Sequence, residues 1–360
     1  MNDNKQMNLD NNTDKLNEIL TTLHSITKQH PHYDGGQKTV NGFIEEWLED
    51  KHGVDISEKT YENYEGRYRN HIQPFFIDMK LIDADHKVIS SFVKYLITRG
   101  ITAGMIHDIV CVLSIALNEA ANVLELIPKN PCKGVHLPKV RKKSTRPSIT
   151  DNEIKILYRV CTNKDNAGYH YWIAIPLLTQ TGMRKGELLA LTWDDIRHDS
   201  INDVWSIRIN KSVSYVRGKG LLQDFTKTPE GCRDIVINND MAELLMLYKE
   251  KTQKNERTYV IAQKKQDKWE DPRNFHRTLK NWIEKAGVRK ELSAHAFRHA
   301  FATRLFLEHA NMDAIKRQGG WKDDKMPYYY ANEMQTEVLK NECADIMGRH
   351  FEGVFNAVIV

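Results

Sequence analysis

Four prolines stand within twenty residues near the middle of the chain, and they constrain the fold more than any other feature. They are Pro128, Pro131, Pro138 and Pro147. Proline fixes its own φ and moves the residue before it out of the helical region, so this stretch stays extended. A chain of 360 residues is long enough for two domains. We therefore predict a linker at residues 128–149 that joins two domains.

Composition excludes several classes of protein. The chain is 41% hydrophobic with a net charge of only +4, so charge alone is a weak indication of a nucleic-acid partner. Five scattered cysteines without a CxxC pair are typical of a reducing compartment and predict neither a disulfide framework nor a zinc site. Without a signal peptide or a run of about eighteen apolar residues, we expect a cytoplasmic protein with no membrane segment.

The first half is predicted to be helical. Residues 37–127 show helical spacing of apolar side chains in four stretches, which begin near residues 39, 57, 88 and 102. The first carries one apolar stripe: Phe43, Ile44, Trp47 and Leu48. The second carries basic side chains, among them Lys59, Arg67 and Arg69. These basic residues either contact DNA or form a solvated face, and local sequence does not choose between the two.

Residues 1–36 form a separate piece with a polar start. Apolar residues then recur at helical spacing, which predicts one short amphipathic helix. They are Leu16, Ile19, Leu20, Leu23 and Ile26. This piece is either a frayed tail or a helix that docks on another copy of the chain.

The second half mixes helices with strands. Thr150 and Glu153 have the spacing of a capping box, and helices are predicted at 171–178, 239–253, 272–286 and 295–308. Arg184 follows a glycine turn at the start of a further helix, where backbone N–H groups favour a phosphate. Alternating segments predict strands: 204–209, 211–215 and 235–237. We therefore expect a mainly α fold with a small antiparallel β-sheet. Without a GxGxxG or P-loop motif, it is no doubly wound nucleotide fold.

One stretch near the C-terminus carries the chemistry. His295 and Arg298 stand three apart on a predicted helix, so they are neighbours on its surface. Trp321 follows two glycines, and a tyrosine cluster ends at Tyr330. An arginine and a histidine can bind a phosphodiester, and a tyrosine hydroxyl can attack one.

Several spaced motifs, in order, resemble the tyrosine recombinase (phage integrase) family over roughly residues 39–345. The family's TGxRxxE motif is matched by Thr181, Gly182, Arg184 and Glu187. Its HxxRH motif is matched by His295, Arg298 and His299. Trp321 stands where the family usually has a histidine, and Tyr330 follows nine residues later, where the family has its nucleophile. The KTxxSxR motif is matched by Lys227, Thr228 and Arg233, with Gly231 at the serine position.

The resemblance implies a catalytic site without metal or cofactor. Arg184 and Arg298 would hold the phosphate oxygens as negative charge develops. Tyr330 would attack phosphorus and keep the strand as a 3′-phosphotyrosine, and Lys227 would protonate the leaving oxygen. His295 would help to deprotonate the tyrosine or bond a phosphate oxygen. Trp321 can donate one indole N–H but cannot act as an acid or base.

The resemblance also implies partners. A helical core-binding domain at 37–127 and an α+β catalytic domain at 150–345 would clamp double-stranded DNA. Three linker side chains, Arg141, Lys142 and Lys143, would contact its backbone. The chain would form a homo-oligomer on DNA, a tetramer in synapsis, and an accessory directionality factor is a further possible partner. The apolar tail at 346–360 would pass to a neighbouring copy or pack on its own domain.

We thus interpret the chain as a site-specific DNA recombinase that cleaves and rejoins DNA, and as the integrase of a phage or other mobile element. Three alternatives stay open on the sequence. The first is a resolvase or chromosome-dimer-resolving recombinase. The second is a catalytically idle DNA-binding regulator of the same fold, and the third is a type IB topoisomerase.

Overall fold

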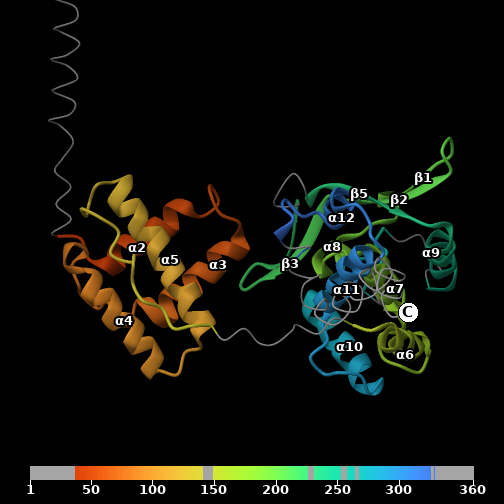
Figure 1. Cartoon of the computed structure of the whole chain (residues 1–360), viewed down its shortest axis with the longest axis horizontal. Coiled ribbons are helices and arrows are strands. Elements are labelled where there is room, and N and C mark those ends of the chain that lie inside the picture. The colour runs from red at the N-terminus through yellow and green to blue at the C-terminus, as the bar shows by residue number, and fades with distance from the viewer. Residues whose placement is uncertain are drawn as a thin grey trace, which may run out of the picture. The chain divides into compact units, whose positions relative to one another are not determined.

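The structure is a computed structural model that describes residues 37–140, 149–225, 231–252, 258–263, 267–325 and 328 (Figure 1). Contacts between residues divide the chain into two compact units, Met1–Arg141 and Lys142–Val360. The boundary falls within the predicted linker. The predicted helix near residues 16–26 and the apolar tail at 346–360 lie outside the described residues.

Over its described residues, 37–140, the N-terminal unit is a bundle of four helices. They are α2 (Val40–Lys51), α3 (Glu58–Arg67), α4 (His86–Thr98) and α5 (Ala103–Asn122). A π-helical turn at Tyr68–Ile72 extends α3, and a 3-10 turn at Leu81–Asp83 precedes α4. Each helix begins at a side chain that accepts a backbone N–H, as in Ser57 and Thr102. The predicted helical fold of this region is confirmed.

The core of this unit gathers around α5. The predicted apolar stripe of α2 is buried in it, as are eight residues of α5. By length and composition alone, α5 could cross a membrane, with a mean hydropathy of 1.4. This departs from the expectation that the chain has no such stretch. Eight residues of α5 are buried, so its position at the centre of a helical core explains its apolar composition.

The C-terminal unit contains helices and strands. The helices are α6 (Asp151–Thr162), α7 (Ala174–Thr181), α8 (Lys185–Ala190), α9 (Asn239–Thr252), α10 (Pro272–Lys285), α11 (Ala294–Leu307) and α12 (Met312–Gly319). The strands are β1 (Ile196–Asp199), β2 (Val204–Ile209), β3 (Lys211–Val216), β4 (Gly220–Phe225) and β5 (Arg233–Ile237). Short 3-10 turns lie at Tyr169–Tyr171 and Trp193–Asp195. Within this unit, α7 and α11 lie side by side, between the strands and the pair α6 and α10 (Figure 1).

The strands form two antiparallel sheets instead of the single sheet predicted. One has the order β1-β2-β5 and the other pairs β3 with β4. Only Asn210 separates β2 from β3, yet the two strands take different partners, Ile207 opposite Ile235 in one sheet and Val213 opposite Gln223 in the other. The strands on either side of Lys227, β4 and β5, therefore belong to different sheets and do not pair with each other.

The start of α7 also differs from the prediction. A helix was expected from residue 171, but Tyr171 closes a 3-10 turn and α7 begins at Ala174. Gly168 precedes this turn with a φ of 82°, in the left-handed region that glycine tolerates. The chain thus changes direction before α7, and the apolar run at 173–178 enters the core of the unit.

The capping box at the start of α6 is confirmed, and it extends to a second element. The Glu153 carboxylate accepts the Thr150 N–H at 2.9 Å and two N–H groups of Arg289, at 2.6 and 2.7 Å. The Arg289 guanidinium, together with Thr150, lowers the pKa of Glu153 to about 2. A depressed folded-state pKa stabilises the fold above the unfolded value near 4.5, and this stabilisation disappears as pH falls towards 2.

We expect Glu153→Gln to lower the free energy of unfolding by about 1 kcal/mol at pH 7, the usual cost of a lost cap. Denaturant titrations at pH 7 and pH 3 measure the effect, which should be smaller at pH 3. The exposed Glu243 on α9 provides the matched control, since Glu243→Gln should change stability little at either pH. An equal loss for Glu153→Gln at both pH values would contradict a contribution from its charge.

Candidate active site

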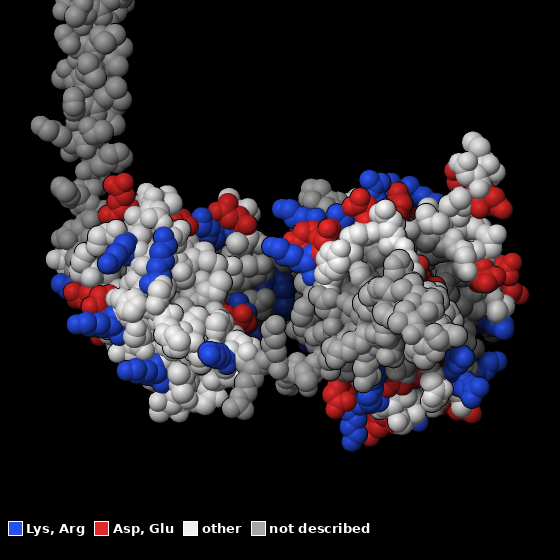
Figure 2. All heavy atoms as spheres, in the orientation of Figure 1, with Lys and Arg blue, Asp and Glu red and all other residues white. Residues whose placement is uncertain are grey.

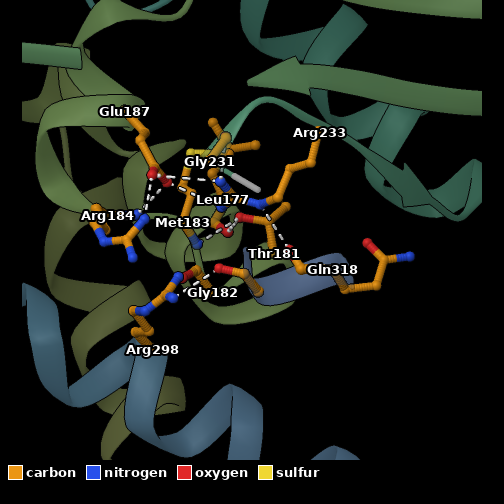
Figure 3. Close-up of polar contacts among 11 residues, drawn as sticks. Leu177, Thr181, Gly182, Met183, Arg184, Glu187, Gly231, Arg233, Arg298 and Gln318 are labelled. Atoms are coloured by element: carbon orange, nitrogen blue, oxygen red, sulfur yellow. Dashed lines mark hydrogen bonds and ion pairs between the residues drawn. The ribbon is translucent and has the colours of Figure 1, made fainter. Parts of the chain in front are cut away.

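The turn between α7 and α8 forms the centre of the site. The helix α7 ends at Gly182, which has a φ of 60°. The Thr181 hydroxyl donates to the Leu177 carbonyl at 2.6 Å and accepts the Met183 N–H at 3.3 Å, so it fixes the turn from inside (Figure 3). Arg184 follows as the N-cap residue of α8, in extended conformation. The predicted position of Arg184 at the start of a helix is confirmed.

Arg298 of α11 ties this turn to the end of α12. Its side chain is buried, with 2% of the residue exposed. Nη1 donates to the Gly182 carbonyl at 2.8 Å and Nη2 donates to the Gly319 carbonyl at 2.7 Å. The guanidinium carbon lies 4.1 Å from the centre of the Trp321 ring, at cation–π distance. Two carbonyls and one aromatic face thus fix the plane of this guanidinium.

Glu187 orients Arg184 from the first turn of α8. One carboxylate oxygen accepts Nη1 of Arg184 at 2.7 Å, and the other accepts its backbone N–H at 2.8 Å (Figure 3). Glu187 is 3% exposed, whereas the Arg184 side chain is 48% exposed. Burial alone would raise the pKa of the Glu187 carboxyl, but the guanidiniums of Arg233 and Arg184 hold that pKa below its usual value. The carboxylate is therefore charged at neutral pH.

His295 and Trp321 differ in how they contribute to the site. His295 lies exposed in the first turn of α11, one turn before the buried Arg298. Trp321 is only 8% exposed, and its ring packs against the Arg298 guanidinium and Gly319. The family usually has a histidine at this position. The tryptophan of this chain presents a larger flat face to Arg298 than an imidazole would.

Two predicted site residues, Lys227 and Tyr330, lie outside the described residues, as do the linker residues Arg141, Lys142 and Lys143. Their contributions stay predictions. Tyr328 is described, and its ring packs edge-on against Phe306 with 6.0 Å between ring centres.

The basic residues proposed on α3 and its extension each face an acidic side chain. Lys59 pairs with Glu62, Arg67 with Asp108 and Arg69 with Glu65. On the side of the N-terminal unit that Figure 2 shows, acidic side chains (red) stand among the basic ones (blue). Exposed ion pairs contribute only about 0–1 kcal/mol, so a DNA phosphate could replace the carboxylate. Contact with DNA and a solvated face both stay compatible with these residues.

A metal site was not predicted, and in the part of the chain that the structure describes no three His, Cys, Asp or Glu side chains gather as metal ligands would. Arg184 and Arg298 bring two guanidinium groups to the α7–α8 turn. Such an arrangement can bind an anionic phosphate through forked N–H donors.

Residues 147–337 match the sequence model of the "Phage integrase family", and residues 39–97 match that of the "Phage integrase, N-terminal SAM-like domain". The chain belongs to the phage integrase family. It is therefore a site-specific DNA recombinase of the tyrosine type, and the predicted fold class and activity are confirmed.

Curated and solved relatives agree with this family. The ICEBs1 integrase of Bacillus subtilis (strain 168) is 26% identical over 279 residues, which cover 74% of this chain and 72% of that one. Among solved structures, the Tn1549 transposon integrase bound to a circular intermediate DNA has a TM-score of 0.69 at 17% identity, over 84% of this chain and 99% of that one. A lambda integrase tetramer bound to a Holliday junction has a TM-score of 0.60 at 19% identity, over 85% and 80%.

Proposed function

We propose that this recombinase integrates and excises a mobile element, and that it does so through a covalent 3′-phosphotyrosine at Tyr330. The observation that carries the proposal is the pair of guanidiniums at one turn: Arg298 is fixed by the Gly182 and Gly319 carbonyls, and Arg184 by Glu187. Donors held in place before the reaction stabilise the pentacoordinate phosphorus without reorganisation. The mobile-element assignment is supported by the names of the ICEBs1 and Tn1549 integrases.

In this mechanism, the Tyr330 oxygen forms a bond to phosphorus while the bond to the 5′ oxygen of the deoxyribose breaks. Lys227 gives a proton to that leaving oxygen, and His295 assists removal of the tyrosine proton or binds a phosphate oxygen. Arg184 and Arg298 hold the two non-bridging oxygens. The phosphotyrosine bond retains the energy of the broken phosphodiester, so the 5′ hydroxyl of a partner strand can reverse the step and join new strands.

We also propose double-stranded DNA as the partner, with four copies of the chain in synapsis. The support is the printed description of the solved relatives, one bound to a circular intermediate DNA and one a tetramer on a Holliday junction. The N-terminal unit and the catalytic unit would contact the duplex with the basic linker between them. An accessory directionality factor and a cytoplasmic location belong to the same proposal, since the substrate is DNA inside the cell.

A nicked suicide duplex tests the proposed function. Cleavage near the nick releases a short strand and traps the covalent complex. We expect the wild-type chain to form this complex in EDTA, and peptide mass spectrometry to place the DNA adduct on Tyr330. An adduct on Tyr328 or Tyr329, or cleavage that requires added magnesium, would contradict the proposed mechanism. An unrelated nicked duplex serves as the control for sequence specificity.

The basic linker leads to a second prediction, which concerns the salt dependence of DNA binding. If Lys142 and Lys143 contact DNA phosphates, replacing both with alanine should weaken binding uniformly across sequences. It should also reduce the slope of log affinity against log salt by about 2, because each lost phosphate contact removes about one released counterion. Fluorescence anisotropy between about 50 and 200 mM salt measures the slope. Two exposed lysines near α6, Lys155 and Lys164, provide the matched double variant. An unchanged slope for the linker variant would place the linker away from DNA.

A further inference from the structure

We propose that Arg233 is a positioning residue for DNA cleavage, and that it keeps Arg184 available to the phosphate by sharing the charge of Glu187. This inference rests on the proposed function and adds a residue to its site. Arg233 is the first residue of β5, and its side chain is 5% exposed. It reaches the Glu187 carboxylate from a different side than Arg184 does (Figure 3).

The Arg233 guanidinium joins three separate segments. Nη2 donates to the Glu187 carboxylate of α8 at 2.9 Å, and Nε donates to the Gln318 carbonyl of α12 at 2.9 Å. Nη1 donates to the Gly231 carbonyl at 3.1 Å, just after the segment that contains Lys227. A planar fork with donors on three sides is a property of arginine that lysine does not share.

Through these contacts, Arg233 is linked to each of the two proposed phosphate-binding arginines by a single intervening group. On one side, the same Glu187 carboxylate accepts Arg184 Nη1 at 2.7 Å. On the other side, Gln318 precedes Gly319, whose carbonyl accepts Arg298 at 2.7 Å. A shift of Arg233 would therefore displace a hydrogen-bond partner of both guanidiniums.

Charge gives Arg233 its specific effect. Arg184, Glu187 and Arg233 together carry two positive charges and one negative charge, so the group keeps a net positive charge beside the phosphate. Without Arg233, the buried carboxylate would be balanced by Arg184 alone, and this pair would be neutral. A neutral pair attracts an anionic phosphate far less than a net cation does, and Arg184 would be drawn towards Glu187.

The test compares Arg233→Met, which keeps an unbranched side chain and loses the charge, with Arg233→Lys, which keeps the charge and loses the fork. Single-turnover covalent attachment to the nicked duplex should fall roughly 10-fold or more in Arg233→Met, the scale of loss expected for a misplaced catalytic group. Arg233→Lys should recover part of the rate. Affinity for DNA should change little in either variant, because many phosphate contacts remain. The matched control is Arg208→Met on β2, opposite Asp234, which should keep the wild-type rate.

A modified substrate separates positioning from general damage to the fold. Replacing one non-bridging oxygen of the scissile phosphate by methyl gives a neutral methylphosphonate. Because this group carries no negative charge, its cleavage depends less on a neighbouring cation. The deficit of Arg233→Met should shrink on this substrate, in parallel with that of Arg184→Ala. A deficit of unchanged size, or a wild-type rate on the ordinary duplex, would overturn the inference. Should Arg233→Met not fold, Arg233→Gln, which also loses the charge, undergoes the same comparison. If the wild-type chain itself formed no covalent complex, the proposed function would fail instead.

Discussion

Arg298→Ala is expected to lower the rate of DNA cleavage by at least ~10²-fold, the typical loss when one fixed transition-state donor is removed. Its guanidinium is held by the Gly182 and Gly319 carbonyls and by the Trp321 ring, so its donors are fixed before the reaction begins. Affinity for the duplex should fall much less, because most of it comes from many phosphate contacts. Rates of covalent attachment and binding isotherms on the same nicked duplex measure the two effects.

Arg184→Ala provides the matched comparison. We expect a similar loss of cleavage but a smaller loss of stability, because the Arg184 side chain is about half exposed. Arg298→Ala, in contrast, leaves two buried carbonyls without their donor, at about 1–3 kcal/mol each. Thermal unfolding of both variants separates the effects on stability from those on chemistry. If cleavage and binding fell by equal factors in either variant, that arginine would only anchor DNA.

The sequence predicted those parts of the fold that depend on local signals. The capping box at Thr150 and Glu153 and the helical stretches that begin near residues 57 and 102 each depend on residues only a few positions apart. For the same reason, the helices α9, α10 and α11 lie close to their predicted ranges. The motif around Arg184 placed it correctly at the start of α8 because a glycine turn must precede it.

Features that depend on distant contacts could not be predicted. The strand β2 pairs with β5 instead of β3, and the paired residues are 24 or more positions apart in the sequence. Three of the four residues of β1 are exposed, so its sequence lacks the alternation of buried and exposed residues that predicts a strand. The short helix α12 was not predicted, because only Ile315 and Gly319 are buried in it. Likewise, the motif named Arg233, but nothing local indicated that it binds both Glu187 and α12.

The site itself shows the same division. Residue types and spacing identified Arg184 and Arg298 as partners of one phosphate, since both are parts of known motifs. The carbonyls that hold Arg298 belong to segments 116 residues before it and 21 residues after it. Only the folded chain brings these acceptors together, so the rigidity of Arg298, on which its catalytic effect depends, is a property of the tertiary structure.

Gly319→Ala is expected to be the most damaging small substitution in the described part of the site. A Cβ at position 319 would lie 1.7 Å from Cζ3 of the Trp321 ring, far inside contact distance. Gly319 is the last residue of α12 and lies outside the left-handed region, unlike Gly320 with its φ of 66°. Alanine is therefore compatible with the backbone, and the three atoms nearest to the added Cβ all belong to the Trp321 ring.

The displaced ring would leave the Arg298 guanidinium, and the Gly319 carbonyl would shift with it. Overpacking of this kind costs about 1–3 kcal/mol of stability, and a displacement of about 1 Å can lower a rate by ~10²-fold. We expect Gly319→Ala to lose cleavage on this scale, as measured by covalent attachment to the nicked duplex. The control is the same substitution in a Trp321→Ala background, where the clashing ring is absent and the added methyl should cost little further stability or rate. Equal effects of Gly319→Ala in both backgrounds would show that the Trp321 ring is not the cause.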